Sequence, residues 1–492
     1  MKLLLGIDIG SSSVKCALVD VDSGECIGSA FSPKTEMQIH APRQGFAEQD
    51  PRVWWEEFKH AFFELKSEIR FQQDAIVAIG ISYQMHGLVA VDKSGTPVMN
   101  SIIWCDSRAV DTGNHAFASL GEEFCLSHYL NSPGNLTASK LKWVKDNQPD
   151  VFNKIYKIML PGDYISYCLT GEMNTTISGL SEGVMWDVQH EALAKDLLDQ
   201  YGIDNSLICD LVPQFGEQGK LSATVANELG LKVGIPIAYR AGDQPNNAYS
   251  LNVLQPGEIA ATAGTSGVVY GVIDAPAYDA QSRVNTFVHV NHQPHAKRYG
   301  VLLCINGTGI LNSWMQKNIF QGASYPEMNQ LAASTPIGAD RLLCYPFGNG
   351  AERVLENKSP GAMMRNIDFN RHGKGHLARA AQEGIVFSLC YGIEIMATMG
   401  LKINTVRAGK SNMFLSPLFS EAFSNTTGAS VELFNTDGAQ GAARAAGVGA
   451  GYYANTDESF KGLKILERIE PQVELQNAYK EAYAYWLQHL QL

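Results

Sequence analysis

The first segment able to do chemistry is a glycine- and serine-rich turn near the N-terminus. It reads GIDIGSSSVK, so an apolar strand ends at Asp8 and a turn of small residues follows. Backbone N–H groups at Gly10, Ser11 and Ser12 can converge on phosphate oxygens, and the Asp8 carboxylate can hold Mg²⁺, usually through water. An ordinary hairpin with a capping aspartate explains these residues equally well. Lys15 fits either a phosphate ligand or a solvated strand residue.

A second turn of the same character lies halfway along the chain, at Gly264-Thr265-Ser266-Gly267. It offers backbone donors and adds hydroxyl groups. Each turn alone is a weak signal. Together, on two halves of one protein, they can hold a polyphosphate.

The third segment places an aspartate at the start of an expected helix, in Ala241-Gly242-Asp243-Gln244-Pro245-Asn246. Proline suits the first turn of a helix, so Asp243 can simply cap that helix. Alternatively, Asp243 accepts the proton of a substrate hydroxyl as a new O–P bond forms, a general-base role. The residues alone favour the cap and are compatible with both.

Two further segments carry the side chains that a sugar pocket needs, which are hydrogen-bonding groups beside an apolar wall. The first is Gln84-Met85-His86-Gly87, and the second is Ile103-Trp104-Cys105-Asp106-Ser107-Arg108. Taken alone, a histidine in the core and a tryptophan used for packing explain them as well.

Three histidines, His289, His292 and His295, stand at a spacing that can hold a metal. No cysteine or acid accompanies them, and Pro294 indicates a loop. We therefore do not predict a metal site there.

The elements that must position these residues alternate between strands and helices. Strands are expected over residues 3–9, 14–19, 25–31 and 75–82, and a helix with Trp54, Trp55, Phe58, Phe62 and Leu65 at helical spacing over 51–69. The pattern strand, small-residue turn, strand recurs over 258–273, which indicates a duplicated α/β fold. We predict two lobes, residues 1–246 and 247–492.

Composition narrows the class of protein. The chain has 492 residues, a net charge of -12 and no basic cluster, which argues against nucleic acid as a partner. The nine cysteines are scattered and suggest neither a zinc site nor a disulfide framework. The apolar start is too short for a signal peptide or a membrane span. We expect a cytoplasmic protein with no membrane partner; a homodimer is left open.

Together these segments resemble the FGGY carbohydrate kinases, most closely their xylulokinase branch. The match runs over nearly the full chain, with the motifs in family order. Besides the Asp8 turn, the motifs are Glu48-Gln49-Asp50-Pro51, Gln84-Met85-His86-Gly87, Ile103-Trp104-Cys105-Asp106-Ser107-Arg108, Leu160-Pro161-Gly162-Asp163-Tyr164, Gly242-Asp243, Gly264-Thr265-Ser266-Gly267 and Gly438-Ala439-Gln440-Gly441-Ala442-Ala443.

The resemblance implies two actin-like, ribonuclease-H-like lobes with an interlobe cleft for ATP, Mg²⁺ and a sugar. It implies that Asp243 is the base and that Asp8 is the carboxylate on the metal side. The implied nucleotide-binding residues are Gly10, Ser11, Ser12, Lys15, Gly264, Thr265, Gly409, Lys410 and Asn412. The implied sugar-binding residues are Gln84, Met85, His86, Trp104, Asp106 and Gln244.

Two departures from the family pattern bear on the substrate. Lys410 stands where the family has glycine, so its side chain either crowds the nucleotide base or reaches a phosphate. Gln244-Pro245 stands where the family usually has an asparagine after the catalytic aspartate. The expected reaction is phosphorylation of D-xylulose to D-xylulose 5-phosphate. The alternatives are a kinase for ribulose, gluconate or another polyol, or a binding protein whose catalysis has decayed; an actin-like filament or chaperone ATPase ranks last.

Overall fold

The chain folds into two compact units, in a computed structural model that describes residues 1–356, 358 and 360–490. The first unit comprises Met1–Asn252, Phe287–Lys297 and Thr436–Leu463, and the second comprises Val253–Thr286, Arg298–Asn435 and Lys464–Leu492. The predicted division between residues 246 and 247 therefore differs from the structure. It cuts helix α10 (Asp243–Ser250) and misses two later segments that belong to the first unit.

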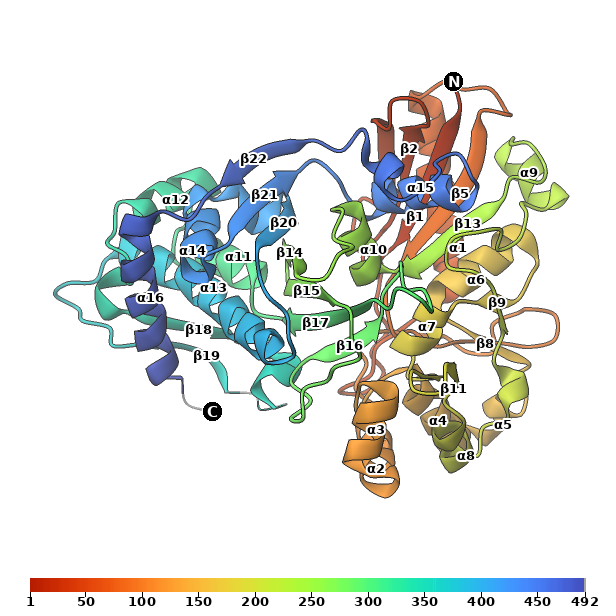
Figure 1. Ribbon diagram of the computed structural model, residues 1–492, viewed down its shortest axis with the longest axis horizontal. Coiled ribbons are helices and arrows are strands. Elements are labelled where there is room, and N and C mark those ends of the chain that lie inside the picture. The colour runs from red at the N-terminus through yellow and green to blue at the C-terminus, as the bar shows by residue number, and fades with distance from the viewer. Residues whose placement is uncertain (357, 359, 491–492) are drawn as a thin grey trace. The chain divides into compact units, whose positions relative to one another are not determined.

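The first unit is built on a five-stranded sheet in the order β13-β5-β1-β2-β3. The first three strands in the chain form an antiparallel meander, whereas β5 and β13 lie parallel to β1 (Figure 1). The strands are β1 (Leu3–Ile9), β2 (Val14–Asp20), β3 (Cys26–Ser32), β5 (Ile76–Tyr83) and β13 (Ile237–Gly242). The strands predicted at the N-terminus are thus confirmed to within two residues at each end.

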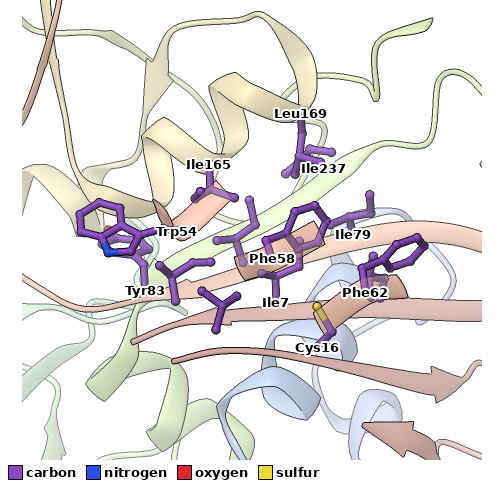
Figure 2. Close-up of a cluster of buried hydrophobic side chains, with 14 of the residues drawn as sticks. Ile7, Cys16, Trp54, Phe58, Phe62, Ile79, Tyr83, Ile165, Leu169 and Ile237 are labelled. Atoms are coloured by element: carbon purple, nitrogen blue, oxygen red, sulfur yellow. The ribbon is translucent and has the colours of Figure 1, made fainter. Parts of the chain in front are cut away.

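One face of this sheet packs against α1 (Pro51–Glu68) and α6 (Pro161–Thr170). Side chains alternate along a strand, and Ile7, Ile79 and Ile237 lie on this face with Trp54 and Phe58 of α1 (Figure 2). Trp54 is fully buried, and its indole N–H donates to the side-chain oxygen of Gln49 at 3.0 Å. The prediction that the tryptophan helix supplies core is confirmed for Trp54.

The opposite face packs against α15 (Gly438–Gly449) at unusually short range. An ideal Cβ on Gly6 of β1 would lie 1.7 Å from the carbonyl oxygen of Ala439, and one on Gly80 of β5 would lie 2.0 Å from that of Ala442. No side-chain carbon fits at either position. The Gly438–Ala443 motif is therefore a helix of small residues whose backbone lies directly on the sheet.

The remaining elements of the first unit surround this sheet. The helices are α2 (Val110–Leu120), α3 (Glu122–Tyr129), α4 (Thr137–Asn147), α5 (Pro149–Phe152), α7 (Ile177–Glu182), α8 (Lys195–Tyr201) and α9 (Ala223–Leu229). Short strand pairs are β4 (Glu48–Gln49) with β7 (Ser101–Ile102), β6 (Val89–Val91) with β8 (Lys157–Met159), β9 (Asn174–Thr175) with β12 (Asp210–Leu211), and β10 (Trp186–Asp187) with β11 (Ala192–Leu193).

The second unit repeats the strand plan of the first. Its seven-stranded sheet has the order β16-β17-β15-β14-β20-β21-β22; β14 is antiparallel to β15 and parallel to β20, as β1 is to β2 and β5. The strands are β14 (Glu258–Ala263), β15 (Gly267–Ile273), β16 (Asn285–Val288), β17 (Tyr299–Ile305), β20 (Thr405–Gly409), β21 (Ser430–Phe434) and β22 (Ile465–Ile469). The Gly264 turn therefore occupies the place that the Gly10 turn has in the first sheet, and the predicted duplication is confirmed.

Helices cover the sheet of the second unit, and the longest of those described is α13 (Lys374–Thr398), which packs against β15 and β17. The others are α11 (Gly309–Asn318), α12 (Tyr325–Ala333), α14 (Pro417–Thr427) and α16 (Val473–Gln488), with a hairpin of β18 (Leu343–Phe347) and β19 (Gly361–Arg365). All nine cysteines are free thiols. Within residues 1–356, 358 and 360–490, no helix has the length and apolar character needed to cross a membrane.

The close packing of α15 on β1 gives a direct test. Gly6→Ala places a methyl group where the Ala439 carbonyl lies, so we expect a loss of about 3 kcal/mol or more in the free energy of unfolding. Urea unfolding followed by circular dichroism measures it. Gly373→Ala is the control, because an ideal Cβ there meets nothing within 4 Å. Equal urea midpoints for Gly6→Ala and the wild type would contradict the packing described.

Candidate active site

The residues predicted to act chemically in the first unit gather at one edge of its sheet. The parallel strands β1, β5 and β13 end at the same level, with Tyr83 paired to both Ile9 and Gly242. The Gly10 turn, Gln84 and Asp243 follow these strand ends directly. The carboxyl ends of parallel strands are where α/β sheets usually bind ligands.

Two acids dominate the electrostatics of this edge. Asp8 is the penultimate residue of β1, and Asp243 is the first residue of α10; both are half-buried. Burial and, second, the nearby charge of Asp8 raise the pKa of Asp243 to about 7. Burial also raises the pKa of Asp8. Two desolvated carboxyl groups this close are an oxygen set that suits a hard cation such as Mg²⁺.

Helix α15 shapes the surroundings of Asp8. Side chains of β1 alternate, so Asp8 faces the same side as Gly6, toward the first turn of α15. An ideal Cβ on Gly438 would lie 2.5 Å from the Asp8 carboxylate. The amide of Asn246 in α10 donates to the carbonyl of Gly438 at 2.8 Å. The helix that carries Asp243 and the helix that faces Asp8 are therefore joined.

Lys15 makes an ion pair that the sequence did not indicate. Its ammonium lies 2.6 Å from the carboxylate of Asp437, the N-cap residue of α15. Burial alone would lower the pKa of Lys15, but the charge of Asp437 and that of Asp8 leave this pKa raised. Lys15 is thus a charged partner of two acids in the first unit rather than a solvated strand residue.

The Gly10 turn is held from two sides. Gln49 donates to the carbonyl of Ser11 at 2.7 Å, and the indole N–H of Trp104 donates to the Ser11 hydroxyl at 3.3 Å. The backbone N–H of Met37 donates to the carbonyl of Ser12 at 2.9 Å. Trp104, predicted to line the sugar pocket, is 39% exposed and lies beside the predicted phosphate turn.

The predicted sugar-binding turn has a strained backbone at His86. Its φ of 60° lies in the left-handed region, which a non-glycine residue adopts at an energetic cost and which is common at functional sites. The ring Nδ1–H donates to the carbonyl of Glu182 at 2.9 Å, and the ring contacts that of Phe287 with centroids 5.3 Å apart. Gln84 and Met85, on the same turn, are 2% and 4% exposed.

A buried lysine that the sequence analysis missed joins the two predicted sugar-binding segments. The ammonium of Lys140 in α4 donates to the carbonyl of His86 at 2.8 Å and to that of Ile103 at 2.9 Å. Lys140 is fully buried, and this burial lowers its pKa to about 7. No local signal identifies it, because lysine is common on helices and only the tertiary fold buries this one.

The prediction that Asp106 contacts the sugar does not match the structure. Asp106 is fully buried, and its carboxylate accepts hydrogen bonds from the Arg108 guanidinium at 2.7 Å and from the backbone N–H of Ala47 at 2.6 Å. Arg108 also pairs with Glu48 at 2.7 Å. These partners saturate the carboxylate, so Asp106 holds the segment around Trp104 in place and does not face a ligand.

The predicted nucleotide residues of the second unit also gather at one sheet edge. The parallel strands β14 and β20 end beside each other, followed by Gly264-Thr265 and by Lys410. The backbone N–H of Gly309, the first residue of α11, donates to the carbonyl of Gly264 at 2.8 Å. An ideal Cβ on Gly264 would lie 3.5 Å from the side-chain amide of Asn412.

Lys410 follows the last residue of β20, and Gln244 is the second residue of α10. The Lys410 ammonium pairs with Glu467 on β22 at 2.9 Å. This ion pair was not predicted; the sequence analysis expected Lys410 to crowd the nucleotide base or to reach a phosphate. Gly409 ends β20. Gln244 follows Asp243 in the first turn of α10, where Pro245 also lies, as predicted.

Histidines do gather in the first unit, but not at the run that contains His289. In the part of the chain that the structure describes, His128, Asp187 and His190 form a group whose ligand atoms all lie within 4.8 Å of one another. The ring nitrogens of His128 and His190 lie 3.0 and 2.8 Å from the same oxygen of Asp187. His289 and His292 instead line a cavity near α7.

The chain is similar in sequence and in fold to known sugar kinases. A xylulose kinase from Staphylococcus epidermidis is 27% identical over 489 residues, 98% of this chain and 95% of that protein. A ligand-bound xylulose kinase from Lactobacillus acidophilus superposes with a TM-score of 0.90 at 20% identity, covering 99% of this chain and 97% of that one. A gluconate kinase from the same organism gives 0.89, also at 20% identity and with the same coverage.

Family models cover both units. The N-terminal domain of the FGGY family of carbohydrate kinases matches residues 3–249, and the C-terminal domain of the same family matches residues 259–450. The solved structures just described, both at 20% identity, show the shared two-domain fold. This chain therefore belongs to the FGGY family of carbohydrate kinases and is a sugar kinase.

Proposed function

We propose that this kinase transfers the γ-phosphoryl group of ATP to the terminal hydroxyl of a small open-chain ketose, with D-xylulose as the preferred substrate. The observation that carries the proposal is the half-buried carboxyl group of Asp243, whose pKa is raised to about 7 at the edge of the first sheet. An acid with that pKa is deprotonated in a useful fraction at neutral pH and still basic enough to take a proton.

In the proposed reaction Asp243 accepts the hydroxyl proton as the substrate oxygen attacks the γ-phosphorus. The bond between that phosphorus and the β,γ-bridging oxygen breaks, and ADP leaves with the electron pair. Phosphoryl transfer depends mainly on positioning and on neutralising charge. The strained His86 turn and Met85 support a sugar subsite on the same sheet edge as the base.

We further propose that the Asp8 carboxylate holds the Mg²⁺ ion that accompanies ATP. Mg²⁺, when bound, supplies positive charge that the phosphate oxygens require. The donor set fits such an ion, because the Asp8 carboxylate is desolvated and lies near a second acid. Backbone N–H groups of the Gly10 turn and of the Gly264 turn are the proposed phosphate contacts, with Gly409 and Asn412 beside the nucleoside.

Gluconate is the strongest alternative substrate. The fold of this chain is shared equally with a xylulose kinase and a gluconate kinase, both at 20% identity. Two relatives matched by sequence over more than nine-tenths of this chain, from Staphylococcus epidermidis and Bacillus subtilis, are xylulose kinases.

The role of Asp243 is tested by replacing it. Asp243→Asn removes the base and keeps the shape, so we expect sugar-dependent ADP release to fall by about 10²–10⁴-fold. A coupled ADP-release assay measures turnover, and calorimetry with ATP measures nucleotide binding, which should stay close to that of the wild type. Asp92→Asn, in an exposed turn, is the control. Turnover by Asp243→Asn equal to that of the wild type would remove the proposed base.

The substrate is tested by a panel of free sugars and sugar acids with Mg-ATP. We expect kcat/KM for D-xylulose to exceed that for ribulose and for gluconate by about 10-fold or more, because a buried polar pocket discriminates strongly between hydroxyl patterns. A preference for gluconate over every ketose would overturn the substrate assignment and leave the phosphotransfer chemistry intact.

A further inference from the structure

A third buried acid lies at the site and has no role in the reaction described so far. Glu182 is the last residue of α7, between Ser181 and Gly183. It is 1% exposed. A fully buried acid without a paired cation is rare, because burial disfavours the charged form strongly. Its presence beside two functional segments therefore requires a physical reason.

Glu182 contacts both segments that the kinase reaction uses. Its Oε1 lies 3.4 Å from the backbone N–H of His86, and its carbonyl accepts the Nδ1–H of the same residue. An ideal Cβ on Gly242 would lie 2.4 Å from Oε2 of Glu182 and 2.6 Å from Cγ of Met85. The Glu182 carboxyl group thus lies against the backbone that leads into Asp243.

We propose that Glu182 is a positioning residue that ties the His86 turn to the Gly242–Asp243 segment, and that it does so as a neutral carboxylic acid. The inference rests on the proposed function, because it gives Glu182 the task of holding the sugar-binding turn and the base in one geometry. Misplacement of reacting groups by about 1 Å can cost about 10²-fold in rate. The left-handed backbone of His86 needs such support from its neighbours.

The surroundings of the carboxyl group favour the protonated form. Within the described residues, Oε2 is buried, has no partner within hydrogen-bond geometry and lies beside Gly242. An anionic carboxylate there would be compensated by the backbone N–H of His86 and the Tyr83 hydroxyl, with no paired cation in the part of the chain that the structure describes, whereas a protonated one loses much less solvation. Burial and the charge of Asp243 raise the pKa of Glu182 well above its ordinary value, in agreement with this geometry.

The charged and titratable neighbours of Glu182 do not reverse this balance. Lys140 donates to the carbonyls of His86 and Ile103, and Arg240 is paired with Asp163 at 2.8 Å. In the described part of the chain, neither makes an ion pair with Glu182. The groups that face it are Asp243 on α10, Tyr83 on β5, the backbone N–H of His86, Asp163 on α6 and Lys140 on α4.

Two substitutions distinguish a neutral positioning acid from a carboxylate that acts in its ionised form and from a residue with no role in the reaction. Glu182→Gln keeps the shape, the acceptor and the neutral charge, so we expect kcat/KM for the sugar within about 3-fold of the wild type. Glu182→Ala removes the tie, and we expect a loss of about 10²-fold in kcat/KM for the sugar, with ATP binding by calorimetry unchanged. Rescue by the amide is the result that a working carboxylate would not give.

The outcomes that overturn the proposal are distinct. Equal losses in Glu182→Gln and Glu182→Ala would show that the ionised form is needed, and wild-type kinetics in Glu182→Ala would remove the positioning role. If Glu182→Ala does not fold, infrared difference spectra of the wild type and Glu182→Gln at neutral pH decide the protonation state. In the difference spectrum, where bands common to both proteins cancel, we expect the C=O stretch of one protonated carboxyl group on the wild-type side; carboxylate bands there instead would refute the proposal. These spectra need no turnover, so they stand even if Asp243 proves not to be the base.

Discussion

The near-contact between the backbone of α15 and the strands β1 and β5 is the constraint on which the first unit depends. It requires glycine at residues 6 and 80, and it places the first turn of α15 against Asp8. The same helix binds α10 through Asn246, so the helix that begins at Asp243 is fixed relative to the same strands. A hydrophobic core that includes Trp54 and Phe58 packs on the other face of the same sheet.

The carboxyl groups of the first unit lie in different surroundings. Asp106 forms an ion pair with Arg108, and Asp163 forms one with Arg240. Asp8 and Asp243 share one sheet edge, and the charge of Asp8 adds to the burial that raises the pKa of Asp243. Glu182 is fully buried, with its Oε2 beside Gly242. Carboxyl groups placed in different environments take different protonation states, which is how one site holds both bases and acids near neutral pH.

The sequence predicted those parts of the fold and of the candidate site that depend on residues close together in the chain. The first strands, the tryptophan helix and the repeated strand–turn–strand unit follow from periodicity and glycine-rich turns, and family resemblance singled out Asp8, Asp243 and the His86 turn. The roles of Asp106, Lys140 and Glu182 were missed because burial and partners come from segments far apart in the chain. The return of Thr436–Leu463 to the first unit was missed for the same reason.

Asp243 is proposed to act as a base because its surroundings raise its pKa. The decisive measurement is the pH dependence of kcat/KM for the sugar at saturating Mg-ATP. The base is active when deprotonated, so a raised pKa predicts that kcat/KM falls as the pH is lowered through about 7, with the slope of one proton. A value of kcat/KM that stays constant down to about pH 5 would contradict the account, since that is the behaviour of an aspartate with an ordinary pKa.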